Sequence, residues 1–148
     1  MSDFHVVSAN VIEHDGKFLL VQEGKESVRG QWNLPAGGVK SDESIKEGAV
    51  REAYEETGLN VELEGLLGVF TDESDQTDST VLIFVFSSTP ANYDIQVSDG
   101  EILDADFFAP EEFSDMNIRV PFLDEAVNRY MEGKIMDIEV LKDYSRLK

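Results

Sequence analysis

The sequence runs Gly37-Gly38-Val39-Lys40-Ser41-Asp42-Glu43 and continues, after seven residues, as Arg51-Glu52-Ala53-Tyr54-Glu55-Glu56-Thr57-Gly58-Leu59. This pattern predicts a glycine-containing loop that leads into a short acidic helix. Glu52, Glu55 and Glu56 stand at positions i, i+3 and i+4, so their carboxylates project from one helix face. Neighbouring like charges repel by roughly 0.2–0.5 kcal/mol per exposed pair, whereas a divalent cation would bind all three. The spacing alone therefore indicates a metal site.

The ends of this helix carry recognisable start and stop signals. Ser44 and Glu47 have the S-x-x-E spacing of a capping box, which places Ser44 at the N-cap. Gly58 is a typical residue at the position that follows the last helical turn. The helix is therefore predicted to occupy the residues between Ser44 and Gly58.

The two faces of the predicted helix differ in character. The face opposite the glutamates is expected to pack on a sheet, and it carries Val50, Ala53 and Thr57. Gly48 lies one turn before Glu52 on the acidic side, where its missing side chain is expected to leave space beside the carboxylates. That space favours a binding site over a merely solvated face.

The rest of the chain alternates between apolar extended segments and polar loops. Strands are predicted at residues 4–13, 18–22, 32–36, 61–71, 80–87 and 102–108, with 80–87 the strongest and central. Asp15-Gly16 is typical of a tight hairpin, so the first two strands are expected to pair. A helical turn is predicted at 110–113 and a helix at 121–131, whereas the tail 135–148 is ambiguous. This order predicts an α+β fold, an α/β/α sandwich with a mixed sheet, in a single domain of residues 1–148.

The composition restricts the classes of function. The 148 residues include no cysteine, which excludes disulfides, thiolate zinc sites and cysteine nucleophiles. A net charge of −19 disfavours duplex nucleic acid and anionic membranes as partners. The chain contains no membrane-spanning apolar run and no basic leader, so a soluble, cytoplasmic protein is expected. An anionic small molecule remains compatible with the charge if metal ions bridge it to the carboxylates.

The residues quoted at the start match a known pattern over 23 positions. Gly37, Glu43, Arg51-Glu52, Glu55-Glu56 and Gly58, with apolar Ala53 and Leu59, resemble the Nudix box, G-x5-E-x7-R-E-U-x-E-E-x-G-U, where U is apolar. The preceding Trp32-x-Leu34-Pro35-x-Gly37 also resembles the usual lead-in of this family. The resemblance implies a Nudix-type sandwich and hydrolysis, dependent on Mg²⁺ or Mn²⁺, of a nucleoside diphosphate linked to another group.

The resemblance also implies roles for individual residues. Glu52, Glu55 and Glu56 would be metal ligands, together with the carbonyl oxygen of Gly37. Arg51 and Glu43 would form an ion pair that supports the loop and the glutamates. Oxygen ligands suit a hard divalent cation, which usually also keeps waters and substrate phosphates in its shell.

The general base is left open, because family members differ in where it sits. The candidate catalytic residues are Glu52, Glu55 and Glu101, the last of which lies outside the box and could equally be a surface glutamate. Weaker candidates are Glu73 and Asp75 in an acidic loop, while His5 and His14 are expected to be surface or strand residues. Trp32 could bind substrate by stacking on a ring or could serve only for packing.

The identity of the diphosphate substrate is not encoded in any motif outside the box. The alternative function is a Nudix-fold ligand-binding or regulatory domain without catalysis, and a purely structural acidic domain is a third. The complete set of box glutamates argues against a non-catalytic domain. The sequence is compatible with a homodimer but does not determine the oligomeric state.

Overall fold

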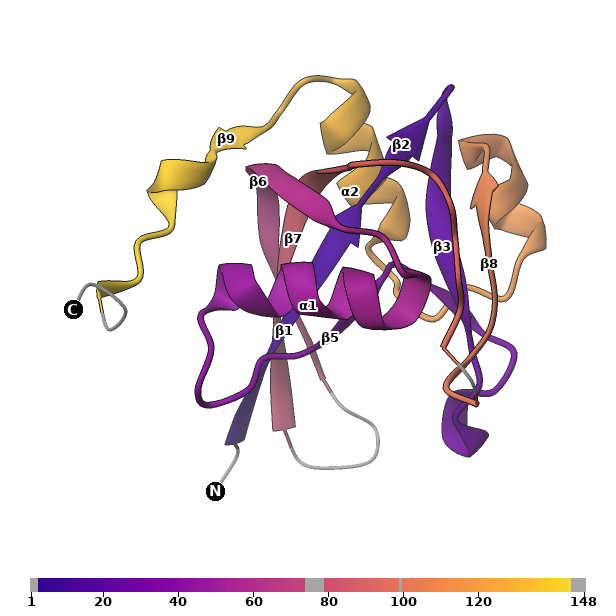
Figure 1. The fold of residues 1–148 in the computed structure, drawn as a ribbon, viewed down its shortest axis with the longest axis horizontal. Coiled ribbons are helices and arrows are strands. Elements are labelled where there is room, and N and C mark those ends of the chain that lie inside the picture. Colours follow the sequence, from indigo (N-terminus) through magenta and orange to yellow (C-terminus); the bar gives the residue numbers. More distant parts are fainter. Residues whose placement is uncertain (1–2, 74–78, 99, 145–148) are drawn as a thin grey trace.

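The computed structural model describes residues 3–73, 79–98 and 100–144. In these ranges the chain forms two β-sheets, two α-helices and three short 3₁₀ turns (Figure 1). No helix among the described residues is long and apolar enough to cross a membrane.

The larger sheet has five strands and is mixed, as predicted. Its order is β5-β1-β7-β6-β9, with β1 and β7 parallel and the other neighbours antiparallel. The strands are β1 (Asp3–Val11), β5 (Ala36–Gly38), β6 (Val61–Glu73), β7 (Ser79–Pro90) and β9 (Met136–Asp137). The apolar strand β7 is the central one, which confirms the prediction for residues 80–87.

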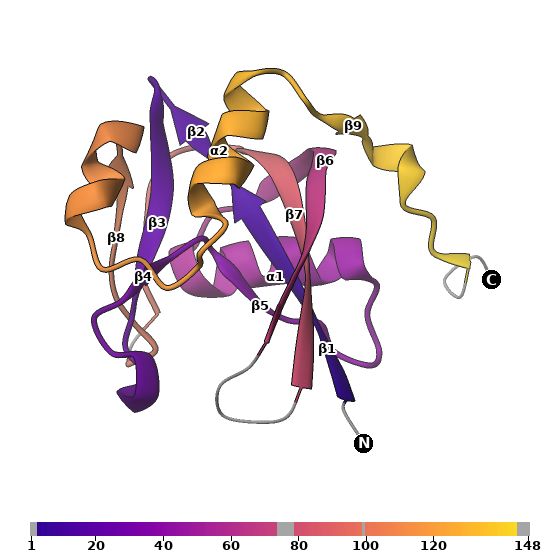
Figure 2. The same ribbon diagram turned by 180° about the vertical axis from the view of Figure 1, so that it is seen from behind.

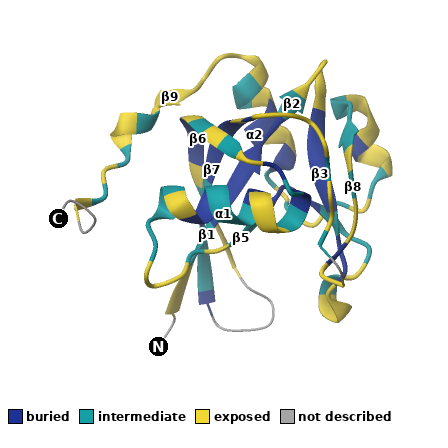
Figure 3. Ribbon diagram, in the orientation of Figure 1, coloured by how far each residue is buried: buried dark blue, intermediate teal, exposed yellow. Residues whose placement is uncertain are grey.

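Two helices cover the opposite faces of this sheet, α1 (Ile45–Thr57) on one and α2 (Leu123–Met131) on the other (Figures 1 and 2). Alternation along β1 separates the faces. Ala9 and Val11 join the apolar cluster that contains α2, whereas Ser8 and Asn10 bond to carbonyls of α1. The α/β/α sandwich is therefore confirmed, and Figure 3 shows the buried residues concentrated between the layers.

The smaller sheet is antiparallel and corrects one prediction. It contains β2 (Glu13–His14), β3 (Lys17–Glu23), β4 (Trp32–Asn33) and β8 (Ile102–Phe108). The Asp-Gly turn forms, with positive φ at Asp15 and Gly16, but only Glu13–His14 pairs across it. The strand of residues 4–13 was expected to pair with 18–22, and it does so only next to the turn, where Glu13 is opposite Phe18 and the Leu19 N–H donates to the Ile12 carbonyl. For residues 4–11 the expectation is wrong.

The physical reason is that each strand finds a longer partner elsewhere. β1 pairs with β7 over nine residues, from Asp3 opposite Ser79 to Val11 opposite Ser87. β3, whose residues 18–21 are buried, lies between β2, β4 and β8. A period-two pattern identifies a strand but not its neighbour, so the two sheets could not be separated from sequence.

The extended segment predicted at residues 32–36 is divided between β4 in the smaller sheet and β5 in the larger one. The segments after β8 follow the prediction more closely. Besides η1 (Glu26–Val28), the structure contains η2 (Pro110–Asp115), where the helical turn was predicted. Helix α2 begins two residues later than expected, at Leu123. The ambiguous tail contains both kinds of element, β9 and then η3 (Ile138–Val140). The acidic loop lies partly outside the described residues, including Asp75.

Candidate active site

Helix α1 begins and ends as the sequence predicts. The hydroxyl of Ser44 accepts a hydrogen bond from the Glu47 N–H, and the Glu47 carboxylate accepts one from the Ser44 N–H. Gly58 has φ 75° and its N–H donates to the Tyr54 carbonyl. These caps satisfy backbone groups that helix ends leave unpaired, and they fix where the glutamates lie along the helix.

The buried face of α1 differs slightly from the prediction. It consists of Gly48, Ala49, Ala53 and Thr57. Val50 was expected on this face but is only half-buried, because positions 49, 53 and 57 lie one above the other at four-residue spacing. The space expected at Gly48 is filled as well: an added Cβ would lie 3.2 Å from both the Glu43 carboxylate and the Val39 side chain. Gly48 therefore permits close packing of the loop and leaves no cavity beside the carboxylates.

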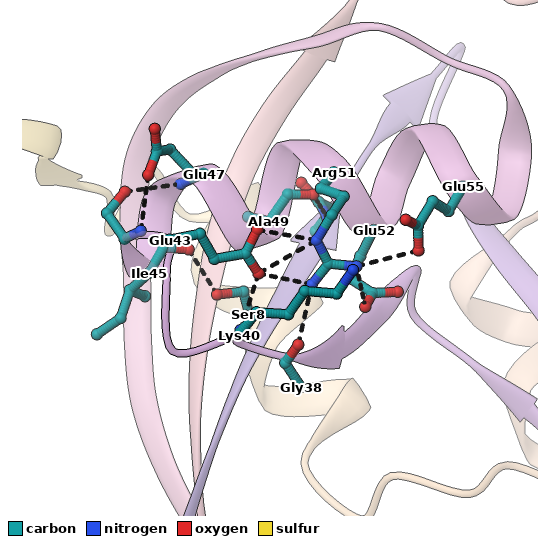
Figure 4. Close-up of polar contacts among 12 residues, drawn as sticks. Ser8, Gly38, Lys40, Glu43, Ile45, Glu47, Ala49, Arg51, Glu52 and Glu55 are labelled. Atoms are coloured by element: carbon teal, nitrogen blue, oxygen red, sulfur yellow. Dashed lines mark hydrogen bonds and ion pairs between the residues drawn. The ribbon is translucent and has the colours of Figure 1, made fainter.

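Arg51 is the centre of the charged network on this helix (Figure 4). Its Nη2 lies 2.6 Å from Glu43 Oε1, and its Nε lies 2.9 Å from Glu43 Oε2. Its Nη1 donates to Glu52 Oε1 at 2.8 Å and to Glu55 Oε1 at 3.0 Å. The remaining Nη2 contact, 3.0 Å, reaches the Gly38 carbonyl. One guanidinium thus connects the loop to two of the three glutamates.

The residues expected to form a glycine loop begin as strand β5, where Gly37 pairs with Ser8 of β1, and only from Val39 do they form a loop that leads into the helix. This segment contacts helix α1 directly at Gly37. A Cβ on this residue would lie 2.2 Å from Cδ of Glu52, so only glycine allows the backbone to approach the carboxylate this closely. Next to it, the Ala36 N–H donates to Glu56 Oε1 at 3.0 Å. Gly37, Glu52 and Glu56 are therefore brought together, as expected.

Burial and neighbouring charge give these carboxyl groups different proton affinities. Hydrogen bonds from Arg51 lower the pKa of Glu43 to about 2. Burial raises the pKa of Glu52, against the opposing effect of Arg51. Burial also raises the pKa of Glu56 to about 9, assisted by the negative charges of Glu52 and Glu23. At neutral pH Glu43 is ionised, and Glu56 is protonated while no cation is bound.

The oxygen atoms at this site are ligands of the kind that a hard divalent cation prefers. Three carboxylates within two helical turns adjoin a loop whose backbone contacts one of them at Gly37. As the side chains lie, no three Asp, Glu or His residues in the described ranges are arranged to hold a metal ion. The reason is visible in the contacts: Arg51 binds Glu52 and Glu55, while Glu56 faces the Ala36 N–H. Metal binding therefore requires these carboxylates to exchange partners.

Two other predicted site residues have no described contact with the glutamates. Glu101 is exposed in the turn just before β8, and its carbonyl accepts a hydrogen bond from the Gly24 N–H. Trp32 in β4 is half-buried against the α2-side core, with its ring edge-on to Phe108 at 4.9 Å. The packing of Trp32 accounts for its position, and a substrate contact stays a prediction.

The histidines and the remaining acidic candidate lie away from this network. His5 is exposed on β1, and His14 contacts Tyr93 and Phe107 at the hairpin. Glu73 is exposed at the end of β6. The expectation that the two histidines are surface or strand residues agrees with their positions.

A second charged cluster was not anticipated. Glu23 is buried at the end of β3, and its Oε2 accepts hydrogen bonds from Arg119 Nη1 at 3.0 Å and from Asn33 Nδ2 at 3.1 Å. Its charge contributes to the raised pKa of Glu56, so the cluster lies close to the glutamates of α1. In sequence Glu23 resembles any polar residue at a strand end, and Arg119 is 96 positions away.

Comparison with known proteins gives a consistent result. A family model described as NUDIX domain matches residues 4–129. The chain is 30% identical to phosphatase NudJ of Escherichia coli (strain K12), over 95% of this chain and 92% of that protein. A NUDIX hydrolase from Nitrosomonas europaea superposes with a TM-score of 0.86 at 31% identity, covering 96% and 98% of the two chains. A MutT protein from Methanosarcina mazei Go1 gives 0.76 at 28% identity, covering 90% and 97%.

Proposed function

The chain belongs to the Nudix hydrolase family, and we propose that it cleaves the phosphoanhydride bond of a nucleoside diphosphate linked to a further group, with Mg²⁺ or Mn²⁺ as cofactor. The observation that carries this proposal is the contact between Gly37 and the Glu52 carboxylate on the helix that also presents Glu55 and Glu56. It supports a site in which a loop carbonyl and three carboxylates act on one ligand.

We assign the metal ligands to Glu52, Glu55, Glu56 and the carbonyl oxygen of Gly37. A bound divalent cation supplies positive charge that offsets the charge of the diphosphate oxygens and of the leaving group. Arg51 and Glu43 hold the loop against the helix through their ion pair, which fixes the carbonyl relative to the carboxylates. This positioning is the main contribution that the polypeptide makes to phosphoryl transfer.

The base that takes a proton from the attacking water is proposed among Glu52, Glu55 and Glu101. Glu52 and Glu55 share one Arg51 nitrogen, so either carboxylate can leave it while the other keeps the guanidinium in place. Glu101 is an exposed residue in the turn that precedes β8 of the smaller sheet. Substituting each glutamate by glutamine and comparing pH–rate profiles distinguishes them, because loss of the base abolishes the ionisation that limits the rate at low pH.

The proposal is tested with a panel of nucleoside triphosphates, nucleotide sugars, dinucleotides and thiamine-type diphosphates, with and without Mg²⁺. Orthophosphate and pyrophosphate are measured separately, since the relative from E. coli is named a phosphatase. Glu55→Gln is expected to lose at least about 100-fold in kcat, whereas the same substitution at exposed Glu111 leaves kcat unchanged. No turnover of any compound, or a Glu55→Gln variant as active as wild type, contradicts catalysis. Ligand-dependent stabilisation without turnover would instead support the regulatory alternative.

A further inference from the structure

Asn10 lies outside the Nudix box, in β1, and is completely buried. Its Nδ2 donates to the Ala49 carbonyl at 2.9 Å and to the Pro35 carbonyl at 3.2 Å. Its Oδ1 accepts a hydrogen bond from the Ser88 hydroxyl on β7 at 2.7 Å. One side-chain amide thus joins the centre of the sheet to helix α1 and to the segment that precedes the glycine loop.

The two carbonyls belong to the two halves of the candidate metal site. Pro35 is two residues before Gly37, and Ala49 lies one helical turn before Glu52. Gly37 and Glu52 are so close that an added Cβ would overlap the carboxylate at 2.2 Å. A small movement of the loop relative to the helix therefore changes the arrangement of the ligand oxygens directly.

The side chain of Asn10 is not needed to satisfy these carbonyls. The Pro35 carbonyl already accepts the backbone N–H of Asn10 at 2.9 Å. The Ala49 carbonyl belongs to the interior of α1, where it also accepts the N–H four residues later. The amide therefore adds directional contacts that fix the spacing of two segments already bonded elsewhere. The two carbonyls can only accept, so they require Nδ2 to face them, and Oδ1 then points to Ser88. The Ser88 hydroxyl, which can donate or accept, donates to this oxygen and ties the amide to β7.

We propose that Asn10 is a positioning residue for the metal site, setting the distance between the Gly37 loop and the carboxylate face of α1 and thereby the affinity for a divalent cation. This inference rests on the proposed function. Asn10 acts through its bonds to Pro35 and Ala49, and its side chain itself binds neither metal nor substrate. Groups bonded directly to metal ligands typically contribute 10–100-fold to metal affinity. Asn10 acts one residue contact further out, so an effect of about 10-fold is expected.

The test compares three alanine variants in the full chain. Asn10→Ala removes both bonds to the carbonyls, and Ser88→Ala removes only the bond that ties the amide oxygen to β7. Ser8→Ala is the matched control. Ser8 lies on the same face of β1, and its hydroxyl donates to the Ile45 carbonyl of the same helix at 2.6 Å. Its backbone pairs with Gly37 in the β1–β5 ladder, which the substitution keeps, and its side chain has no described bond to Pro35 or Gly37. Mn²⁺ binding to the substrate-free protein is measured by electron paramagnetic resonance, and Tm is measured in EDTA.

We expect Asn10→Ala to raise the Kd for Mn²⁺ about 10-fold or more and Ser88→Ala to raise it by a smaller factor, with kcat recovering at saturating Mn²⁺. Ser8→Ala is expected to lower Tm by about as much as Asn10→Ala does, but to change the Kd for Mn²⁺ less than about two-fold. Equal changes in Kd for Ser8→Ala and Asn10→Ala overturn the inference, since they reflect general destabilisation. If Asn10→Ala does not fold, an unchanged Kd in Ser88→Ala overturns it. A wild-type protein that binds no Mn²⁺ overturns the proposed function itself, whereas wild-type binding with unaltered variants overturns only the role of Asn10.

Discussion

The guanidinium of Arg51 forms a bidentate ion pair with the carboxylate of Glu43, with Nη2 2.6 Å from Oε1 and Nε 2.9 Å from Oε2. Both side chains are largely shielded from solvent. The pair joins the glycine loop to helix α1, so its strength determines how firmly the two halves of the candidate site are held together. Its consequences for pH dependence can be measured.

Glu43→Gln is expected to lower the free energy of unfolding at pH 7 by about 2–3 kcal/mol, as for hydrogen bonds between charged groups. The pKa of Glu43 is lowered from 4.5 to about 2 by Arg51, so its stabilisation is complete above pH 4.5. It is lost as the pH falls through about 2. Urea unfolding at pH 7, 4 and 2.5 should show the difference between wild type and variant shrinking toward low pH. Parallel curves would contradict this role of the pair.

Glu56 is expected to release a proton when a divalent cation binds. Burial raises its pKa to about 9, and a carboxyl group must be ionised to bind a metal. Calorimetric titration with Mn²⁺ at pH 7, in buffers of different ionisation enthalpy, should show release of close to one proton, and the affinity should increase up to about pH 9. Glu56→Gln, the matched variant, should show no such release from this position. Heat changes independent of the buffer would contradict the assignment.

The same group should make the metal-free protein less stable in alkali. Because the folded pKa of Glu56 lies above its unfolded value of 4.5, the folded state binds the extra proton. Stability from the neutral form is complete below pH 4.5 and is lost as the pH rises through about 9. In EDTA at pH 9, Glu56→Gln is therefore expected to have a higher Tm than wild type, by roughly 2–4 °C for each kcal/mol gained. The glutamine in this variant keeps an Oε1 atom that can accept the hydrogen bond from the Ala36 N–H. If Glu56→Gln had a lower Tm than wild type at pH 9, ionisation of Glu56 would not destabilise the folded protein.

Gly37→Ala is expected to weaken Mn²⁺ binding and kcat/KM at least about 10-fold, because the new methyl group would displace the Glu52 carboxylate. The displaced atoms are the end of a flexible side chain, so Tm should change by only a few degrees. Gly38→Ala is the matched control, since nothing lies within 4 Å of a Cβ at that position and its φ is not positive. Similar losses in both variants would exclude the contact with Glu52 as the cause.

Arg119→Ala is expected to destabilise the protein because it leaves the buried Glu23 carboxylate without its cation. We expect about 1–2 kcal/mol, less than the 3–5 kcal/mol of a fully buried pair, since Arg119 is 45% exposed. In a double-mutant cycle, Glu23→Gln should remove much of the effect of Arg119→Ala, because the neutral amide that replaces the carboxylate needs no cation. Strictly additive losses would show that the two residues are not coupled.

The features predicted correctly are those whose causes lie close together in sequence. The caps of α1 and the Asp-Gly turn involve residues within four positions of each other. The ion pair of Arg51 with Glu43, which the resemblance to the Nudix box implied, spans eight. Their geometry follows from the backbone of a single element and its adjoining loop. The central position of β7 was also predictable, because a strand with few polar residues needs cover on both faces.

The features that were missed depend on contacts between distant segments. The partner of β1 proved to be β7, and the hairpin expected with residues 18–22 was limited to Glu13–His14. Asn10 is bonded to Ser88, which is 78 positions away. An amide within an apolar strand was a signal that could have drawn attention to Asn10, although nothing local specifies its partners.

Helical spacing and capping act over three or four residues, so the amino-acid pattern was enough to predict an acidic helix of defined length with three carboxylates on one face. The folded structure decided which of those carboxylates is buried and which has a raised pKa. It also brought Gly37 into contact with the Glu52 carboxylate and placed Asn10 where its side chain bonds to both the Pro35 and the Ala49 carbonyl. Burial and electrostatic shifts arise from atoms that folding brings together across the sheet, and a linear pattern contains no information about those distances.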